Sequence, residues 1–140
     1  MDEPTIPYQY IEEVQSTVLT AGDPIDIGCK ESKIEKYKSL AREINPGKPI
    51  TVVSGWIWLD LEVNAEQFEA AISLGYAPAV LNINNVIYDD RKKFKNGTWV
   101  CTSLLKQFHS PALFETKNTF YILVGVGSRK AVHLDALGFV

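Results

Sequence analysis

The chain has 140 residues, of which 46% are hydrophobic and 22% are charged, and its formal net charge is −3. This size and composition are typical of a globular protein with one core, so we expect residues 1–140 to form a single domain. Proteins that coat duplex DNA or anionic membranes are usually basic, because neutralising phosphates supplies most of their non-specific affinity. The acidic total therefore argues against both kinds of partner, although it does not eliminate nucleic acid.

We expect a cytoplasmic protein from three features of the sequence: the composition of residues 1–10, the length of the apolar runs and the use of cysteine. Residues 1–10 have neither the basic region nor the apolar core of a secretory signal. The apolar runs are shorter than the ~20 residues that a membrane-spanning helix needs. Cys29 and Cys101 are too far apart in sequence for a metal-binding spacing, and a core of this size does not need one disulfide. We therefore expect reduced thiols and no membrane attachment.

Residues 1–47 predict a helical N-terminal part with two helices. Apolar side chains of the first helix repeat at helical spacing, at Ile11, Val14, Val18 and Leu19. The breaker at residues 21–24 ends this helix. Ser32 and Glu35 form a capping box that opens the second helix, which ends at residues 45–47.

Residues 50–61 predict the most hydrophobic strand. Alternation places Val52, Trp56 and Trp58 on one face, and Val53, Ile57 and Leu59 on the other. A strand that is apolar on both faces is covered on both, so we place it at the centre of the sheet. If no helix covers Trp56 and Trp58, they would form an exposed patch that marks a partner site.

A third helix is predicted next, with Asn64 as its N-cap, Gln67 at its N3 position and Gly75 just after its end. The stripe that faces the sheet would be Phe68, Ala71 and Ile72. A strand follows near residues 80–83. It is either a parallel partner after a crossover or a return over one face of the sheet.

Residues 85–130 alternate strand-forming and turn residues, as in an antiparallel meander. The strongest hairpin signal is Asn96-Gly97, because both turn residues must adopt φ > 0. Strands are predicted at residues 86–90, 99–108, 113–116 and 119–126. The predicted fold is α+β, with two or three helices packed on a mostly antiparallel sheet of five or six strands. Residues 48–130 would hold this sheet with one inserted helix, and residues 131–140 would form a tail.

The one basic cluster of the chain lies at the tip of the predicted hairpin and consists of Arg91, Lys92, Lys93 and Lys95, with the aromatic Phe94 inside it. The four cations could bind phosphates or an acidic protein surface, while Phe94 stacks on a base or fills a pocket of the partner. Lysines beside a hairpin are equally an ordinary protection of an exposed strand edge. Because the chain is acidic overall, we favour a protein partner for this cluster.

A small nucleotide- or metal-binding enzyme is the rival interpretation. Its site would use the glycine turn GVGSR, Gly125 to Arg129, together with Asp60 and Asp89. The two carboxylates would approach each other if the strands that carry them are neighbours. However, the turn lacks the third glycine of a dinucleotide fingerprint, and no serine or cysteine has the context of an activated nucleophile. We therefore expect no cofactor, no metal and no catalytic residue.

Three blocks carry a resemblance to a known family: WVCTSLL at residues 99–105, FETKNTFYIL at residues 114–123 and GVGSR at residues 125–129. They are similar to the pattern W-V-x-T-S-x-L, F-x-T-x-N-T-x-Y-x-L and G-x-G-x-R of an uncharacterised family of small bacterial proteins, frequent in phage and prophage genomes. The similarity extends weakly upstream of these blocks. It implies a small accessory protein of a mobile element and carries over no functional residue.

We therefore predict a non-enzymatic cytoplasmic protein that works by binding another protein. The expected contacts are the basic cluster and a second patch around Asn118 and Arg129. A nucleic-acid-binding regulator is a third interpretation. It requires a continuous basic stripe that joins residues 30–38 to the hairpin. The sequence indicates no oligomeric state.

Overall fold

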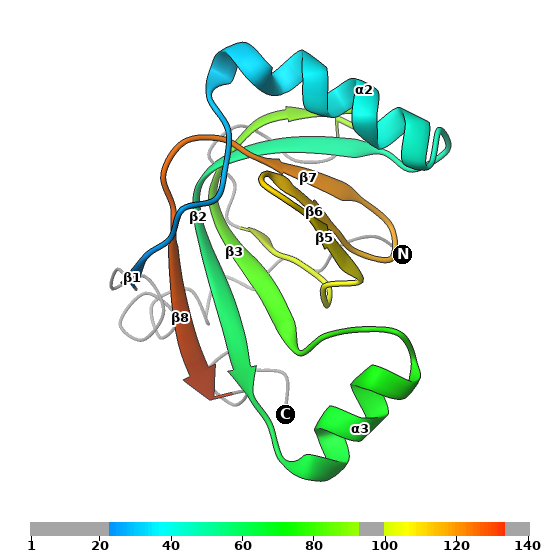
Figure 1. Ribbon diagram of the computed structural model, residues 1–140, viewed down its shortest axis with the longest axis vertical. Helices are drawn as coiled ribbons and strands as arrows, with labels where there is room; N and C mark the ends of the chain where they lie inside the picture. Colours follow the sequence, from blue (N-terminus) through cyan, green and yellow to red (C-terminus); the bar gives the residue numbers. More distant parts are fainter. Residues whose placement is uncertain (1–22, 93–99, 134–140) are drawn as a thin grey trace.

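The structure, a computed structural model, describes residues 23–92 and 100–133. Within these residues, two α-helices accompany one mixed sheet of eight strands (Figure 1). In chain order the elements are β1 (Asp23–Pro24), a 3-10 turn (Glu31–Lys33), α2 (Ile34–Ile44), β2 (Ile50–Glu62), α3 (Ala65–Ser73), β3 (Ala79–Asp89), β4 (Val100–Cys101), β5 (Gln107–His109), β6 (Leu113–Glu115), β7 (Phe120–Leu123) and β8 (Ser128–His133). The predicted α+β class is confirmed. The predicted first helix and the Asn96-Gly97 turn lie outside the described residues.

Strand β2 is the centre of the sheet, as its apolar sequence predicted. β3 pairs antiparallel with one edge of β2 along nearly its whole length, so α3 is a return and not a crossover. Two strands in succession share the other edge. β7 pairs in parallel with residues 50–53, and β8 pairs in parallel with residues 57–62. The remaining pairings, β1 with β8, β3 with β4, β5 with β6 and β6 with β7, are antiparallel.

Two predicted boundaries are wrong. Separate strands were expected on either side of Asn84-Asn85, but β3 is continuous, because both side chains are exposed and do not interrupt the pairing with β2. A tail was expected from residue 131, but β8 extends to His133. The glycine turn at residues 125–127 therefore joins two strands of the sheet, β7 and β8.

A kink at Gly55 reverses the side-chain alternation of β2. Gly55 has a φ of +60°, a left-handed conformation that favours glycine. Before the kink, Val52 packs in the cluster under α2, whereas Val53 shares a cluster with Trp56 and Trp58. The predicted grouping of Val52 with the two tryptophans is therefore wrong. Both tryptophans are core residues, with 1% and 6% exposure, and they form no exposed patch.

Residues 100–109 close the sheet around the tryptophan cluster. This segment pairs first with β3 through β4 and then with β6 through β5. Backbone hydrogen bonds from Ala77 N–H to Leu105 O and from Lys106 N–H to Glu115 O continue both contacts. One strand was predicted over residues 99–108, but the chain changes its pairing partner there and forms two short strands. The sheet itself thus encloses its largest core.

Helix α2 lies across the first half of β2 and across β7 (Figure 1). It buries Tyr37 and Ala41. The predicted capping box of Ser32 and Glu35 is wrong, because a 3-10 turn leads into the helix and its N-cap, Lys33, makes no side-chain hydrogen bond. The helix ends at Asn45, as expected.

Helix α3 has the predicted ends but not the predicted packing. The Asn64 side chain accepts from Gln67 N–H at 2.7 Å, and the Gln67 side chain accepts from Asn64 N–H at 2.9 Å, which is a complete capping box. Gly75 follows the helix with a φ of +87°. No residue of α3 is buried, and the helix stands at the end of β2, away from the sheet (Figure 1). Phe68 and Ile72 therefore do not face the core.

Candidate binding surface at the start of strand β2

The start of β2 brings two predicted contact regions to the same end of the sheet. On one side, Asp90 N–H donates to the backbone of β2 at 2.9 Å, which places Arg91 and Lys92 there. On the other side, Phe120 N–H donates to the residue before β2 at 3.0 Å, which places the β6–β7 turn with Asn118 there. The other members of the predicted basic cluster, Lys93, Phe94 and Lys95, lie outside the described residues.

Asp90 fixes the first side of this surface. Its carboxylate accepts two hydrogen bonds from the Arg42 guanidinium at 3.3 Å each, one from the Tyr88 hydroxyl at 2.6 Å and one from Ile50 N–H at 2.9 Å. Burial would raise the pKa of Asp90, but the hydrogen bonds and the Arg42 charge outweigh it and hold the pKa below its usual value. The Lys38 ammonium lies 3.8 Å from the centre of the Tyr88 ring. Helix α2 is thereby held against the end of β3.

The neighbouring carboxylate, Asp89, is buried beneath the surface. Thr51 Oγ1 donates to it at 3.0 Å, and Arg91 Nε lies 3.7 Å away. Asp60, which the rival enzyme site requires, lies nine positions further along β2, roughly 30 Å at the usual rise of a strand. The expected approach of Asp60 and Asp89 is therefore wrong, because β2 and β3 are antiparallel. Within the two described ranges, no group of three or more His, Cys, Asp or Glu residues is placed to hold a metal ion.

A buried charge network fixes the second side of the surface. The Lys48 ammonium donates to the Glu115 carboxylate at 2.5 Å and to Thr116 O at 2.9 Å. The other Glu115 oxygen lies 2.9 Å from His109 Nε2. The Lys48 and Glu115 side chains are each only 6% exposed. Burial would raise the pKa of Glu115, but the hydrogen bonds with His109 and Lys48 and the charge of Lys48 hold the pKa below its usual value.

We define the basic rim as the region formed by Arg42, Arg91, Lys92, Lys117 and Asn118. Its exposed cations are Arg42, Lys92 and Lys117, whereas the guanidinium nitrogens of Arg91 are buried. The β6–β7 turn separates two pockets of the rim. The larger, of about 440 Å³, is lined by Asn45, Gly47, Lys48, Pro49, Lys117 and Asn118. The smaller, of about 240 Å³, is lined by Tyr76, Ser103, Leu104 and the same two turn residues. No described carboxylate lines either pocket, so an acidic group entering them would meet amides and ammonium groups.

Arg129 does not belong to this surface. It pairs with Trp58 in the register of β8, eight positions along β2 from the start of the strand, a separation of roughly 25 Å. Its guanidinium donates to both oxygens of Asp60, at 2.6 and 3.0 Å, and lies 4.9 Å from the Trp58 ring. The expected patch of Asn118 with Arg129 is therefore wrong, because the two residues lie at different ends of β2. A binding role for either residue alone stays a prediction.

The glycine turn lies beside a cleft of about 640 Å³ that is also lined by residues 26–31. The chain is tied to its neighbours where the turn begins. Gly125 N–H donates to Cys29 O at 2.9 Å, and the preceding Val124 N–H donates to Val53 O at 2.8 Å. These two N–H groups are therefore not available to an anion, and they give no support to a phosphate loop. Burial raises the pKa of the Cys29 thiol, which disfavours a reactive thiolate in the cleft.

A family model for a domain of unknown function, DUF6957, matches residues 26–138. The chain belongs to the DUF6957 family. The match runs from the loop after β1 past the end of β8. No curated protein and no solved structure matches the chain. Within residues 23–92 and 100–133, no helix is both long enough and apolar enough to cross a membrane.

Sequence reasoning missed the buried Lys48–Glu115 pair of this DUF6957 domain. One signal was available: Glu115 is a carboxylate inside the short strand Leu113–Glu115, whose other residues are apolar, and a buried charge needs a partner. Nothing identified that partner. Lys48 stands between Gly47 and Pro49 in a turn, where a lysine is normally exposed. The pairing joins residues far apart in sequence, and only the fold reveals it.

Acid should destabilise this DUF6957 domain through Asp90 and Glu115. Folding lowers the pKa of both groups, so their contribution to stability is complete above the unfolded pKa and is lost as the pH falls through the folded values. We expect the free energy of unfolding to decrease below about pH 4.5. Urea denaturation at a series of pH values measures this. Asp90→Asn should lower the stability at neutral pH and flatten the acid decline, and an unchanged decline would contradict the assignment.

Proposed function

We propose that this DUF6957 protein is a non-enzymatic accessory protein of the cytoplasm that binds an acidic protein partner through the basic rim. The observation that carries the proposal is the position of Arg91–Lys92 and of the Asn118 turn on the two sides of the start of β2. Two free cysteines, Cys29 and Cys101, fit a reducing compartment. The resemblance to phage-associated proteins supports a role in a mobile element, where the partner would be a host factor.

The rim suits an acidic partner in two ways. Its exposed cations would steer the approach of a negative surface and raise the association rate. The 440 Å³ pocket would then receive a carboxylate among the Lys117 ammonium and the amides of Asn45 and Asn118. The Asp90 and Glu115 networks hold the two sides of the rim in place before binding. A fixed surface loses little conformational entropy when its partner arrives.

The test is a charge reversal at two exposed positions, Lys92→Glu with Lys117→Glu. Tagged wild-type protein is expressed in the native host and recovered at low salt, and the co-purifying protein is identified and purified for titration. We expect the double variant to bind this partner at least tenfold more weakly, because both sides of the rim become negative. The matched control is Lys33→Glu with Lys36→Glu, which makes the same change in net charge at the other end of α2. Circular dichroism checks that both variants are folded.

Undiminished binding by the folded Lys92→Glu/Lys117→Glu variant would overturn the assignment to the rim.

One observation keeps the nucleic-acid interpretation as a second candidate. The Lys38–Tyr88 contact joins the basic residues of α2 to the end of β3, where Arg91 begins the rim. A stripe of this kind predicts that the control variant weakens binding as much as the rim variant. It also predicts that the bound material is removed by nuclease and that affinity falls steeply with salt.

A further inference from the structure

Helix α3 exposes an apolar stripe that no described element covers. Phe68 and Ile72 are 45% and 48% exposed, and they lie one turn apart on the same side of the helix. Leu74, directly after the helix, is 74% exposed. Of the seven large hydrophobic side chains exposed in the described ranges, these three fall within seven residues. Single exposed apolar side chains are ordinary, but a cluster on one element indicates an interaction surface.

The helix is maintained without a core of its own. It has only nine residues, a length at which an isolated helix is marginal in water, and most helices of this size are stabilised by packing an apolar face. Here the capping box of Asn64 and Gln67 and the left-handed Gly75 hold the two ends, while no side chain between them is buried. The capping residues thus stabilise a helix whose apolar face has no partner within the described structure.

The charges around the stripe indicate what it binds. Residues 60–75 contain four carboxylates, Asp60, Glu62, Glu66 and Glu69, and no lysine or arginine. Asp60 is neutralised by Arg129, whereas Glu62, Glu66 and Glu69 are exposed on α3 or directly before it. A partner that covers Phe68 and Ile72 must therefore face an acidic border, and a basic segment would be attracted to it.

Other occupants of the stripe carry the wrong charge. A second copy of the chain docking through its own α3 would bring carboxylates against carboxylates. Residues 1–22 contain four carboxylates and residues 134–140 contain one, and neither segment has a lysine or arginine. Charge complementarity thus disfavours these three occupants. Residues 93–99 contain two lysines and no carboxylate, but this short segment is tethered at both ends, by Lys92 beyond the end of β3 and by Val100, which pairs with Ile83.

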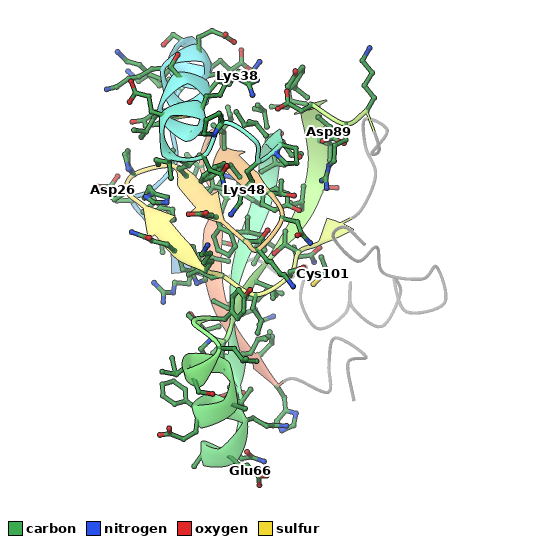
Figure 2. All side chains as sticks on the ribbon, turned by 90° about the vertical axis from the view of Figure 1, so that its right-hand side faces the viewer. Asp26, Lys38, Lys48, Glu66, Asp89 and Cys101 are labelled. Carbon is green, nitrogen blue, oxygen red and sulfur yellow. The ribbon has the colours of Figure 1, made fainter. Side chains whose placement is uncertain are left out.

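We propose that α3 is a docking helix for a basic amphipathic segment of another protein, with apolar residues at helical spacing and lysines or arginines beside them. The residues of this surface differ from those of the basic rim, and the two surfaces adjoin at Tyr76, which lines the smaller pocket of the rim and donates its N–H to Ala71 O of α3 at 3.0 Å. Figure 2 shows Glu66 on α3 at the opposite end of the molecule from Lys38 on α2. The proposal does not rest on the function assigned to the rim, and either can fail without the other.

A defined peptide pair tests the proposal. The first peptide, of about five helical turns, has leucines at helical spacing and lysines at the other positions. The second has glutamate in place of every lysine. Fluorescence anisotropy of labelled peptides measures binding to the full chain. We expect wild-type protein to prefer the lysine peptide, and Phe68→Ser with Ile72→Ser to weaken its binding at least tenfold. Val126→Ser, at a side chain that is 83% exposed elsewhere on the surface, should leave binding unchanged.

A charge-swap variant separates docking from unfolding of α3. Glu66→Lys with Glu69→Lys keeps the apolar stripe and both ends of the helix, so it should lose the lysine peptide and gain the glutamate peptide. Equal wild-type affinity for the two peptides, or unchanged binding in both α3 variants, would overturn the proposal. So would an α3-dependent dimer in sedimentation without peptide, or a rise in affinity on removing residues 134–140. The dimer would assign the apolar stripe to a second copy of the chain, and the rise in affinity would assign it to residues 134–140.

Discussion

Replacing Gly127 with alanine should destabilise the protein by about 3 kcal/mol or more, at the upper end of the cost of overpacking a core. A Cβ atom at this position would lie 2.3 Å from Cδ2 and Cε3 of the Trp56 ring. The ring cannot move away easily, because it is 1% exposed and its Nε1 donates to Val124 O at 3.3 Å. The backbone of the turn would have to shift, which disturbs the junction between β7 and β8 on the edge of β2.

Gly125→Ala is the matched control for this experiment. An added Cβ at Gly125 meets nothing within 4 Å, so its cost comes only from the φ of +77° and should be about 1–2 kcal/mol. Urea denaturation followed by tryptophan fluorescence compares the two variants. If Gly127→Ala were as stable as Gly125→Ala, the close packing of the turn on Trp56 would be refuted. The two glycines of the GVGSR motif thus serve different structural purposes, and neither purpose involves binding a phosphate.

Glu115→Gln should cost about 3–5 kcal/mol, because it leaves the Lys48 ammonium buried without a counter-charge. The substitution also weakens the hydrogen bond between His109 and position 115. The loss should be greatest near neutral pH, where Glu115 is ionised in the wild type, and should shrink in acid as the wild-type carboxyl gains a proton. Urea denaturation at neutral and acidic pH measures both effects.

The double variant Lys48→Met with Glu115→Gln identifies the cause. When the buried cation is removed as well, we expect much of the lost stability to return, because no unpaired charge remains in the core. Strictly additive losses in the two single variants and the double variant would instead show that Lys48 and Glu115 do not interact. A double-mutant cycle on the free energies of unfolding gives this interaction directly.

Local signals in the sequence predicted the elements whose causes are local. The central position of β2 followed from its apolar residues on both faces, and the structure confirms it. The Asn64–Gln67 capping box and Gly75 were also recognised, because a helix end depends on side chains within a few residues of each other. The hairpin of β6 and β7 formed around residues 117–118 as expected. These features explain why the α+β class could be predicted.

The parts that failed depend on contacts between distant residues. The kink at Gly55 reverses the alternation of β2. A glycine inside an apolar run does not show in advance which side chains will share a face after it. The end of β8, residues 131–133, was expected to belong to a tail, and only its place beside β2 makes it part of a strand. The stripe of Phe68 and Ile72 has the spacing of a core face, so the pattern alone cannot reveal that it is exposed.

The candidate surface was predicted only in pieces. Arg91, Lys92 and Asn118 were each singled out, but no pattern in the sequence shows that they flank the same end of β2. Asn118 and Arg129 were expected to form one patch, yet β7 and β8 run in succession along β2 and place the two residues far apart. The register of a sheet thus decides which side chains share a surface.

The order of the strands along the edge of β2 has a consequence for synthesis. When β2, α3 and β3 have left the ribosome, the second edge of β2 is still open, because its partners β7 and β8 are encoded by residues 120–133. An open apolar strand edge is a template for pairing with other chains. We therefore expect nascent chains stalled before residue 120 to associate with chaperones or to aggregate, and native folding to begin only after that segment has emerged.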